Sequence, residues 1–398
     1  SEEDSSVGHL NPSGFLTLDF SRPDSVVEAV HEFHRQYPID AVLGVDDTVV
    51  EAAAVAARAL GLPHNPLEAV TIARDKARAR QVLAEAGVPC PAFVLRYFAD
   101  AGRAEPMPGG FPVVVKPLSL AASRGVIRAN DETELAAAIA RLESILEDDA
   151  GCETGEGFLV EQFVSGPEVA LEGLLRQGHL EVLAVFDKPD PLEGPYFEET
   201  IYLVPSGLDQ ARQREVSRTT EAACEAIGLV EGAVHVELRV TEQGPVVIEV
   251  NPRAIGGLCS DVLRFGTGVA LEDLLLNHAL GDVAPLPERV EAAAGVMMLP
   301  VSVAGTLVRV DGLKEAAAVE GVERVAISAH PGQWLQPLPE GSPYLGFLFA
   351  RGETCEDVEN VLRTAFERLT IVLEKTAVED HALRTIAGNE HAGGEPQP

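Results

Sequence analysis

The sequence is poor in the features that mark secreted, zinc-binding or membrane-spanning proteins. It has five cysteines, an odd number, and no CxxC pair, so neither a disulfide framework nor a zinc site is expected. No run is long and apolar enough to span a membrane, and the chain does not open on a signal-peptide pattern. We therefore expect a cytoplasmic protein whose thiols are reduced.

Positive charge is also scarce. The chain has 30 lysines and arginines against 63 acidic residues, which gives a net charge of −33. Such a surface repels nucleic acid and anionic membranes, so neither is an expected partner. Only five of the basic residues are lysines, namely Lys76, Lys116, Lys188, Lys314 and Lys375. A sequence that favours arginine should keep lysine mainly where a compact point charge is needed.

Several common nucleotide-binding and hydrolytic motifs are missing. The sequence contains no GxxxxGK[ST] motif and no GxGxxG motif after a strand, which argues against a P-loop NTPase and a dinucleotide-binding enzyme. It also lacks the GxSxG and HExxH motifs of serine hydrolases and zinc peptidases. Any nucleotide chemistry must therefore rest on another set of residues.

The length of 398 residues indicates two or three domains. The first part alternates expected strands at 15–20 and 39–45 with helices at 24–36 and 48–60, which favours a small parallel α/β domain that is short by one βα unit. A helix is expected at 73–86, opening at Asp75-Lys76 and stopped by Gly87. Expected strands then follow at 111–116, 126–129, 158–163 and 169–175, with a helix at 132–145.

The second half is expected to be a mixed sheet with flanking helices. We predict an irregular segment at 187–205, a helix at 210–227, a hairpin of 234–240 with 246–250, a helix at 270–280 and a final helix at 356–373. The ends, 1–13 and 388–398, are polar and expected to be loose. The expected domains are 1–72 (N-terminal), 73–180 (first half with a lid), 181–290 (catalytic half), 291–380 (C-terminal extension) and 381–398 (tail).

Five sequence pieces occur in a fixed order. They are Asp75-Lys76, the stretch 112–126 with Lys116 and Ser123-Arg124-Gly125, the stretch 159–168, His235-Val-Glu237, and Ile248-Glu249-Val-Asn251-Pro-Arg253 followed by Gly256-Gly257. Taken together, and in this order, they resemble the ATP-grasp superfamily over roughly residues 40 to 375. The resemblance implies an α/β ATP-grasp fold with a central lid, and an enzyme that uses ATP.

The resemblance implies that Lys76 and Lys116 contact the phosphates of ATP, with Lys116 also catalytic. The loop that ends in Ser123, Arg124 and Gly125 would close over these phosphates, because small side chains allow backbone N–H groups to approach phosphate oxygens. The alternatives are two surface lysines and an ordinary hairpin loop.

Adenine and ribose would bind further along. A strand edge offers both backbone donors and acceptors to adenine, and by resemblance this edge includes Glu161, Phe163 and Val164. Glu168 would hold the ribose hydroxyls, since a carboxylate can accept from both oxygens of a diol. The alternative for Glu168 is an acid on the surface.

Glu237, Glu249 and Asn251 form the expected metal site. Glu249 and Asn251 are two residues apart on one strand and so share a face, and Glu237 lies on the partner strand. Two carboxylates and an amide oxygen are hard ligands suited to Mg²⁺, or Mn²⁺, bound with phosphates. A solvated acidic face is the alternative, although the apolar neighbours of Glu249 argue against it.

The remaining candidates concern catalysis and the substrates. By resemblance Arg253 would stabilise charge on the transferred phosphoryl group, an electrostatic role; an ion pair with Glu249 is the alternative. Gly256 and Gly257 would permit close approach of substrate to the backbone. His235 would contact substrate or pack as a structural histidine, and Glu199 is a candidate for an ammonium group, against the alternative of a solvated loop.

The expected activity is therefore the ATP- and Mg²⁺-dependent joining of a small-molecule carboxylate, such as an amino acid, to an amine through an acyl phosphate, with release of ADP and phosphate. The segment 292–375 resembles the C-terminal extension of L-amino acid ligases and of related branches. A biotin carboxylase-like enzyme, a formate-dependent purine enzyme and a non-catalytic ATP-binding protein remain alternatives. A homodimer is common in the resembling families.

Overall fold

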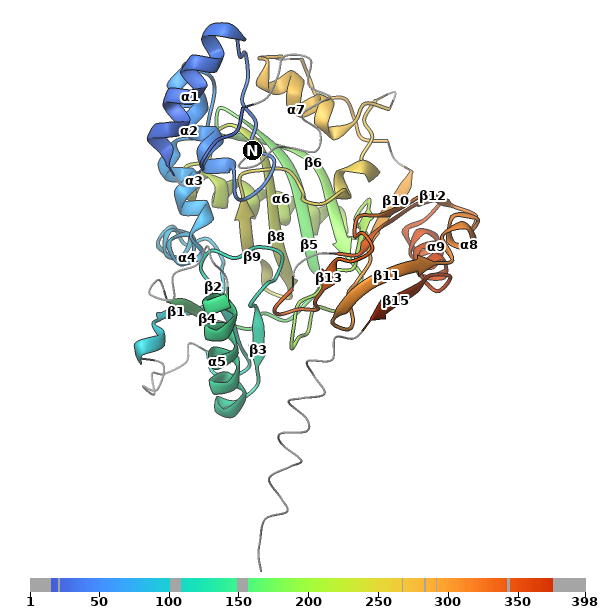
Figure 1. Cartoon of the computed structure of the whole chain (residues 1–398). Coiled ribbons are helices and arrows are strands. Elements are labelled where there is room, and N and C mark those ends of the chain that lie inside the picture. The colour runs from blue at the N-terminus through green and yellow to red at the C-terminus, as the bar shows by residue number, and fades with distance from the viewer. Residues whose placement is uncertain are drawn as a thin grey trace, which may run out of the picture.

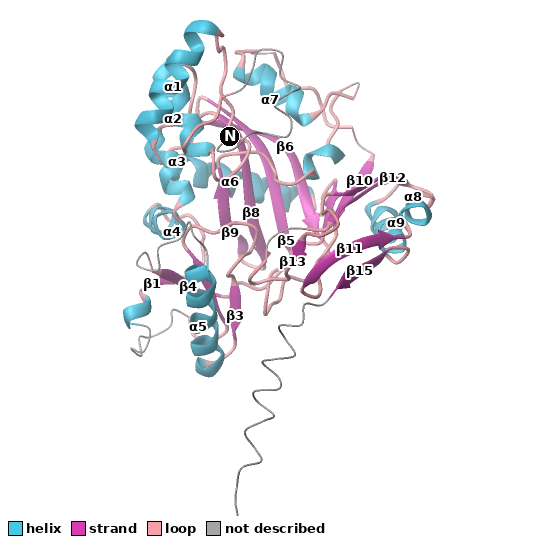
Figure 2. Cartoon of the chain, in the orientation of Figure 1, coloured by secondary structure: helices cyan, strands magenta, loops and turns pink. Residues whose placement is uncertain are grey.

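The structure is a computed structural model that describes residues 16–374, apart from positions 21, 101–108, 149–156, 267, 283, 291, 342 and 343. Within this range the chain forms an N-terminal helical unit, a four-stranded sheet, an eight-stranded sheet and a three-stranded sheet (Figure 1; Figure 2). The mixed helix and strand content confirms the predicted α/β class. No helix in the described part of the chain has the length and apolarity needed to cross a membrane.

The N-terminal unit consists of helices α1 (Pro23–Gln36), α2 (Val50–Leu60) and α3 (Leu67–Arg74). Helix α2 ends at the predicted limit, residue 60, and is followed by Gly61, whose φ of 69° lies in the left-handed region that ends many helices. The strands expected at 15–20 and 39–45 do not form in the described residues, so the prediction of a parallel sheet is wrong there. A strand needs a neighbour for its backbone hydrogen bonds, and no strand among the described residues pairs with 39–45.

Asp75 divides the helix expected at 73–86. Its extended backbone ends α3, and its side chain accepts hydrogen bonds from the N–H groups of Ala77 (2.9 Å) and Arg78 (3.1 Å), which caps helix α4 (Lys76–Glu85). The cap fixes Lys76 as the first residue of α4.

The small sheet, here called the lid sheet, has the strand order β1-β4-β2-β3. Its strands are β1 (Phe93–Arg96), β2 (Val113–Pro117), β3 (Ile127–Ala129) and β4 (Phe158–Gln162), next to a short 3₁₀ turn, η2 (Phe98–Asp100). Helix α5 (Glu132–Asp148) covers one face and packs Leu135, Ile139 and Leu142 against the strands. The valines of β2 fill the same core, which is why Phe-Pro-Val-Val-Val-Lys is almost continuously apolar.

The large sheet has the strand order β12-β14-β10-β7-β6-β5-β8-β9. The strands are β5 (Glu168–Arg176), β6 (His179–Lys188), β7 (Ile201–Val204), β8 (Gly232–Thr241), β9 (Gly244–Asn251), β10 (Ala293–Met298), β12 (Val322–Ile327) and β14 (Gly346–Gly352). The predicted hairpin corresponds to β8 and β9. The described pairings are all antiparallel, so the expected mixed sheet is wrong in this detail. The segment 187–205 is also less irregular than predicted, because β6 enters it and β7 lies within it.

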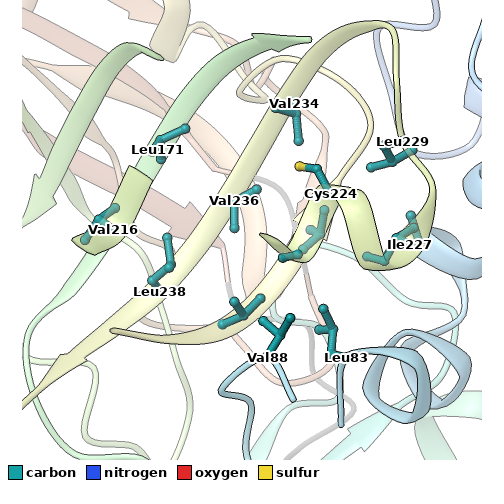
Figure 3. Packing of buried hydrophobic residues seen from close by; sticks show 14 of the residues in the cluster. Leu83, Val88, Leu171, Val216, Cys224, Ile227, Leu229, Val234, Val236 and Leu238 are labelled. Atoms are coloured by element: carbon teal, nitrogen blue, oxygen red, sulfur yellow. The ribbon is translucent and has the colours of Figure 1, made fainter. Parts of the chain in front are cut away.

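Helix α6 (Gln210–Ile227) matches its predicted limits. Asp209 caps its start by accepting from Arg212 N (2.9 Å), and Gly228, with φ 90°, ends it. Alternate residues of β5 and β8, including Leu171, Val236 and Leu238, pack against α6 with Leu83 of α4 (Figure 3). Because successive side chains of a strand point to opposite faces, the other face of β5 and β8 is free to carry polar residues.

The C-terminal part completes the large sheet and adds the three-stranded sheet β13-β11-β15. Its further elements are η4 (Cys259–Val262), α7 (Leu271–Ala279), β11 (Gly305–Asp311), α8 (Leu313–Ala317), β13 (Trp334–Leu335), α9 (Cys355–Phe366) and β15 (Thr370–Glu374). The predicted final helix at 356–373 is thus too long, since its last part is β15. The four cysteines among the described residues are free thiols, as expected, and the predicted tails lie outside the described residues.

Candidate active site

A cavity lies between the lid sheet and the polar face of the large sheet. It takes its walls from β2 and β4 on one side and from β5, β8 and β9 on the other. Most of the predicted site residues line it, namely Lys76, Lys116, Ser123, Glu161, Phe163, Val164, Glu168, Glu199, Glu237 and Glu249. Arg124, Gly125, His235, Asn251, Arg253, Gly256 and Gly257 lie outside its wall.

The two predicted phosphate-binding lysines both face this cavity. Lys76 donates to the carbonyl oxygen of Leu120 (2.8 Å) and forms an ion pair with Glu249 (3.0 Å). Lys116, near the end of β2, forms an ion pair with Glu161 (2.8 Å). Two ammonium groups therefore reach one cavity from α4 and the lid sheet, an arrangement suited to a polyanion.

Glu161 has a structural role that the sequence did not reveal. Its carboxylate also accepts from Arg80 Nε (2.6 Å), so two cations share one fully buried acid. Burial alone would raise the pKa of Glu161, but the charges of Arg80 and Lys116 outweigh it and lower the pKa to about 2. The acid stays ionised and holds Lys116 in place.

The loop before β3 is a tight turn. Ala122 and Ser123 have φ values of 53° and 56°, a left-handed conformation that costs free energy for residues other than glycine. Ser123 lines the cavity, whereas the Arg124 side chain points elsewhere and donates to the carbonyl oxygen of Glu340 (2.8 Å). At Gly125, φ is 70°, and a Cβ would lie 2.8 Å from Leu142 Cδ1.

The opposite end of the cavity is aromatic and charged. The ring centroids of Phe163 and Phe197 lie 6.3 Å apart. The guanidinium of Arg128 lies 4.3 Å from the ring centroid of Phe163. Glu168 accepts from Lys188 Nζ (2.7 Å) and from Arg239 Nε (2.7 Å). Each carboxylate oxygen has a further lone pair, so Glu168 can still accept from a ligand hydroxyl.

The predicted metal ligands are brought to one face of the hairpin. Glu237 is paired directly with Glu249 across β8 and β9, and His235 is paired with Asn251. Directly opposed side chains have Cβ atoms roughly 4.5–5.5 Å apart, so Glu237 and Glu249 can share one cation, and Asn251 follows Glu249 two residues along the same strand face. This donor set, next to two lysines suited to phosphates, fits Mg²⁺ or Mn²⁺.

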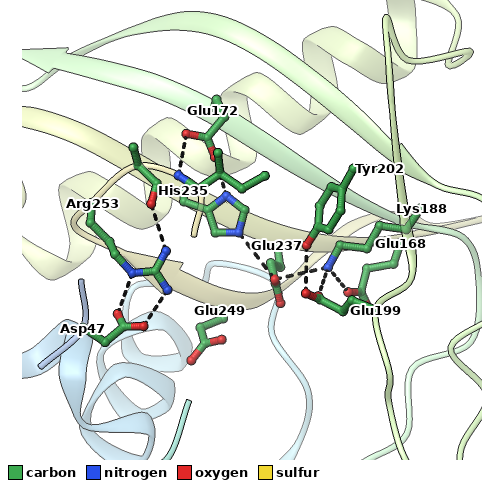
Figure 4. Close-up of polar contacts among 12 residues, drawn as sticks. Asp47, Glu168, Glu172, Lys188, Glu199, Tyr202, His235, Glu237, Glu249 and Arg253 are labelled. Atoms are coloured by element: carbon green, nitrogen blue, oxygen red, sulfur yellow. Dashed lines mark hydrogen bonds and ion pairs between the residues drawn. The ribbon is translucent and has the colours of Figure 1, made fainter. Parts of the chain in front are cut away.

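A polar chain runs from the metal ligands toward Arg253 (Figure 4). Buried His235 contacts Glu172 through Nδ1 and lies 3.5 Å from Glu237 through Nε2. Glu172 in turn accepts from the backbone N–H of Ile255 (3.1 Å). Burial opposes protonation of His235, but the charge of Glu172 outweighs it and raises the pKa to about 9. His235 is thus a satisfied, buried histidine.

Arg253 is paired with Asp47 rather than with Glu249. Its Nε and Nη2 donate to the two carboxylate oxygens of Asp47 at 2.8 and 2.5 Å (Figure 4). This bidentate pair connects the segment after β9 to the N-terminal unit, and Asp47 raises the pKa of Arg253 against the effect of burial. Arg253 and Gly257 line a second cavity, which lies between α2, α7 and the segment after β9.

Three protein families match successive parts of the chain. The ATP-grasp domain family matches residues 109–262, the ATP-grasp N-terminal domain matches 2–64, and the L-amino acid ligase C-terminal domain 2 matches 297–374. The solved structure of an L-amino acid ligase from Bacillus licheniformis is 30% identical with a TM-score of 0.77, over 89% of this chain and 87% of that one. The chain belongs to the ATP-grasp ligases. It falls in the branch that includes L-amino acid ligases.

Two curated relatives are also ligases or synthases. Carnosine synthase 1 of Gallus gallus is 33% identical over 279 residues, 65% of this chain and 30% of that protein. The alanine–anticapsin ligase of Bacillus amyloliquefaciens is 26% identical over 288 residues, 68% of this chain and 60% of that protein. The chain therefore spans less than two thirds of the length of either relative. As an ATP-grasp ligase it is an ADP-forming enzyme that makes carbon–nitrogen bonds.

Several residues of this ATP-grasp site were not predicted. Arg80, Glu172, Lys188 and Arg239 are buried charges whose partners lie on other elements. The scarcity of lysine, which pointed to Lys76 and Lys116, applies equally to Lys188 and was the one available signal. Asp47, at the end of the apolar run 39–45, was visible as an acid, but nothing local paired it with Arg253.

Proposed function

We propose that this ATP-grasp ligase joins the carboxylate of an amino acid to an amine, through an acyl phosphate, with Mg²⁺. The observation that carries the proposal is the single cavity in which Lys76 and Lys116 face the opposed acids Glu237 and Glu249. The match of residues 297–374 to an L-amino acid ligase domain favours this branch over the biotin carboxylase-like and formate-dependent alternatives.

In the proposed first step, a carboxylate oxygen attacks the γ-phosphorus of ATP. The bond from this phosphorus to the bridging oxygen breaks, which leaves ADP and an acyl phosphate. The ammonium groups of Lys76 and Lys116 offset the negative charge on the phosphates, and the lid sheet holds Lys116 over them through Glu161. When bound, Mg²⁺ would neutralise phosphate charge, and Glu237, Glu249 and Asn251 would hold it.

In the second step, the amine nitrogen attacks the acyl carbon. The carbon–oxygen bond to phosphate breaks, the nitrogen loses a proton, and an amide and phosphate remain. Water must be kept from the acyl phosphate until the amine arrives, because water is a competing nucleophile. The lid sheet and its loop, which wall the cavity, supply this exclusion.

The carboxylate substrate is proposed to enter through the second cavity. This cavity borders Arg253, and its wall is largely apolar, with Ala54 of α2, Ile255, and Leu275 and Leu276 of α7. A guanidinium beside an apolar wall suits an amino acid that carries an apolar side chain. Arg253 follows Asn251, the last residue of β9, by two positions, and this nearness to the proposed metal ligands supports its proposed role toward the acyl phosphate.

The test is the release of ADP with ATP and Mg²⁺ against pairs of the twenty amino acids, with formate and bicarbonate included. Release that depends on an amino-acid pair, and that is abolished in Glu249→Gln, supports the proposal. Release with bicarbonate or formate alone would move the enzyme to another branch of the family. The homodimer and the cytoplasmic location stay predictions, to be checked by light scattering and by cell fractionation.

A further inference from the structure

We propose that Lys188 is a positioning residue, whose buried ammonium orients both the acid expected at the ribose end, Glu168, and the acid expected at the metal end, Glu237. One ammonium group would then orient both the acid that binds ribose and the acid that binds the metal ion in the same cavity. The inference rests on the proposed roles of Glu168 and Glu237 in nucleotide and metal binding. It does not depend on which carboxylate or amine is joined.

The contacts of Lys188 are unusually complete (Figure 4). It is the last residue of β6, and its side chain is 3% exposed. Its Nζ lies 2.7 Å from Glu168 and 3.1 Å from Glu237, and it also donates to Glu199. The ammonium can donate three hydrogen bonds, so the three carboxylates use its full capacity.

The three acids come from separate parts of the chain. Glu168 starts β5, Glu237 is on β8, and Glu199 stands just before β7. Strand pairing places Lys188 directly beside Glu168, and β8 follows on the other side of β5. Without the ammonium, three carboxylates would be buried side by side with mutual repulsion, and their side chains would have to separate.

The position of Lys188 distinguishes an orienting role from direct contact. Glu168, Glu199 and Glu237 line the cavity between the lid sheet and the large sheet, whereas Lys188 does not. The ammonium therefore stands behind the carboxylates and acts on a ligand through them. Arg239, which itself lines the cavity, contacts the second oxygen of Glu168 (2.7 Å), so both carboxylate oxygens are held and the carboxylate has little freedom to rotate.

The same contacts explain why this acidic cluster need not bind a second metal ion. Oxygen atoms of Glu168, Glu199 and Glu237 lie within 4.8 Å of one another, a spacing that a metal ion could use. The Lys188 ammonium already bonds to all three. The oxygen lone pairs of Glu237 that do not accept from Lys188 can then bind the metal ion, together with Glu249 and Asn251 on the adjacent strand β9.

The experiment compares Lys188→Met with the wild type and with Lys314→Met, which removes an exposed lysine of α8 as a control. ADP binding is measured by calorimetry with and without Mg²⁺, and Mg²⁺ binding is measured by titration of the ADP complex. Loss of a partner that orients a metal ligand typically costs roughly 10–100-fold in metal affinity. We expect that loss in Lys188→Met, together with weaker ADP binding in the absence of metal.

A merely structural role would lower the melting temperature and leave both binding constants of the folded fraction unchanged. That result would overturn the proposal. If Lys188→Met does not fold, Lys188→Met combined with Glu199→Gln relieves part of the charge imbalance, and the same two constants decide. Because calorimetry needs no acceptor substrate, a failure of the amide-ligase proposal would appear in the ADP-release screen and not in these measurements.

Discussion

Arg141 and Glu340 are 199 positions apart in the chain, yet two hydrogen bonds of 2.6 and 3.0 Å join their side chains. Arg141 belongs to α5 on the lid sheet, and Glu340 belongs to the C-terminal extension. Beside this pair, the N–H of Gly125 donates to the carbonyl oxygen of Pro339 (2.9 Å). The C-terminal extension thus contacts both helix α5 and the loop before β3, so we predict that it affects ATP binding through this loop.

The first prediction concerns this contact. Glu340→Ala should raise KM for ATP about twofold to fivefold, because a partly exposed ion pair contributes roughly 0.5–1 kcal/mol. Steady-state ADP release measures the change, with Glu315→Ala, an exposed acid of α8, as the matched control. An equal KM in Glu340→Ala and wild type would show that the contact does not hold the lid.

Lys116 should matter to the chemical step. Removing a preorganised cation or donor at a site of developing charge costs about 100–1000-fold in kcat. Lys116→Met should therefore lose activity on this scale, while Lys314→Met keeps it. A loss that appears only in KM would mean that Lys116 binds ATP without favouring the transition state.

Arg253 should not be replaceable by lysine. Its two bonds to Asp47 need the planar guanidinium, which an ammonium cannot reproduce. Arg253→Lys should lower kcat/KM for the carboxylate substrate about 10–100-fold, since hydrogen bonds to charged groups contribute roughly 1.5–3 kcal/mol. ADP affinity by calorimetry should stay unchanged; a matching fall in ADP affinity would place Arg253 in nucleotide binding instead.

Glu161 should contribute stability that disappears in acid. Its pKa is depressed to about 2 in the folded chain, below the ordinary 4.5, so the contribution is present above pH 4.5 and is lost as pH falls toward 2. Glu161→Gln leaves Arg80 and Lys116 buried without their acid, at a cost of about 3–5 kcal/mol near pH 7. Urea unfolding measures the free energy of unfolding of the wild type and of Glu161→Gln at pH 7 and at pH 3. The gap between the two proteins should be smaller at pH 3, and an equal gap at both pH values would contradict the depressed pKa of Glu161.

The sequence predicted the parts of the fold with strong local signals. The limits of α6 and the β8–β9 hairpin follow from capping residues and from alternation of polar and apolar residues. The run 39–45 has an equally apolar pattern but forms no strand, because pairing depends on a partner elsewhere in the chain. The final strand β15 was hidden for the same reason, as its partner is β11.

In the candidate site, too, residues with a local sequence signal were predicted and residues that depend on distant partners were not. Residues that carry a motif, such as Lys116 and Glu249, could be named from sequence and do line the cavity. No role could be given to Lys188 or Arg80 from the sequence. Each is distinguished only by being buried beside acids on elements that are distant in the sequence. Sequence spacing gives the face of a strand but not the register that sets Lys188 beside Glu168.

The central claim, an acyl phosphate on the way to an amide, has a direct isotopic test. The carboxylate substrate found in the ADP-release screen is labelled with ¹⁸O in its carboxyl group, and the phosphate released is analysed by mass spectrometry. An acyl phosphate places one carboxyl oxygen in each phosphate released, so the phosphate should carry one ¹⁸O per turnover. Phosphate without label, formed at the same rate as the amide, would contradict the mechanism.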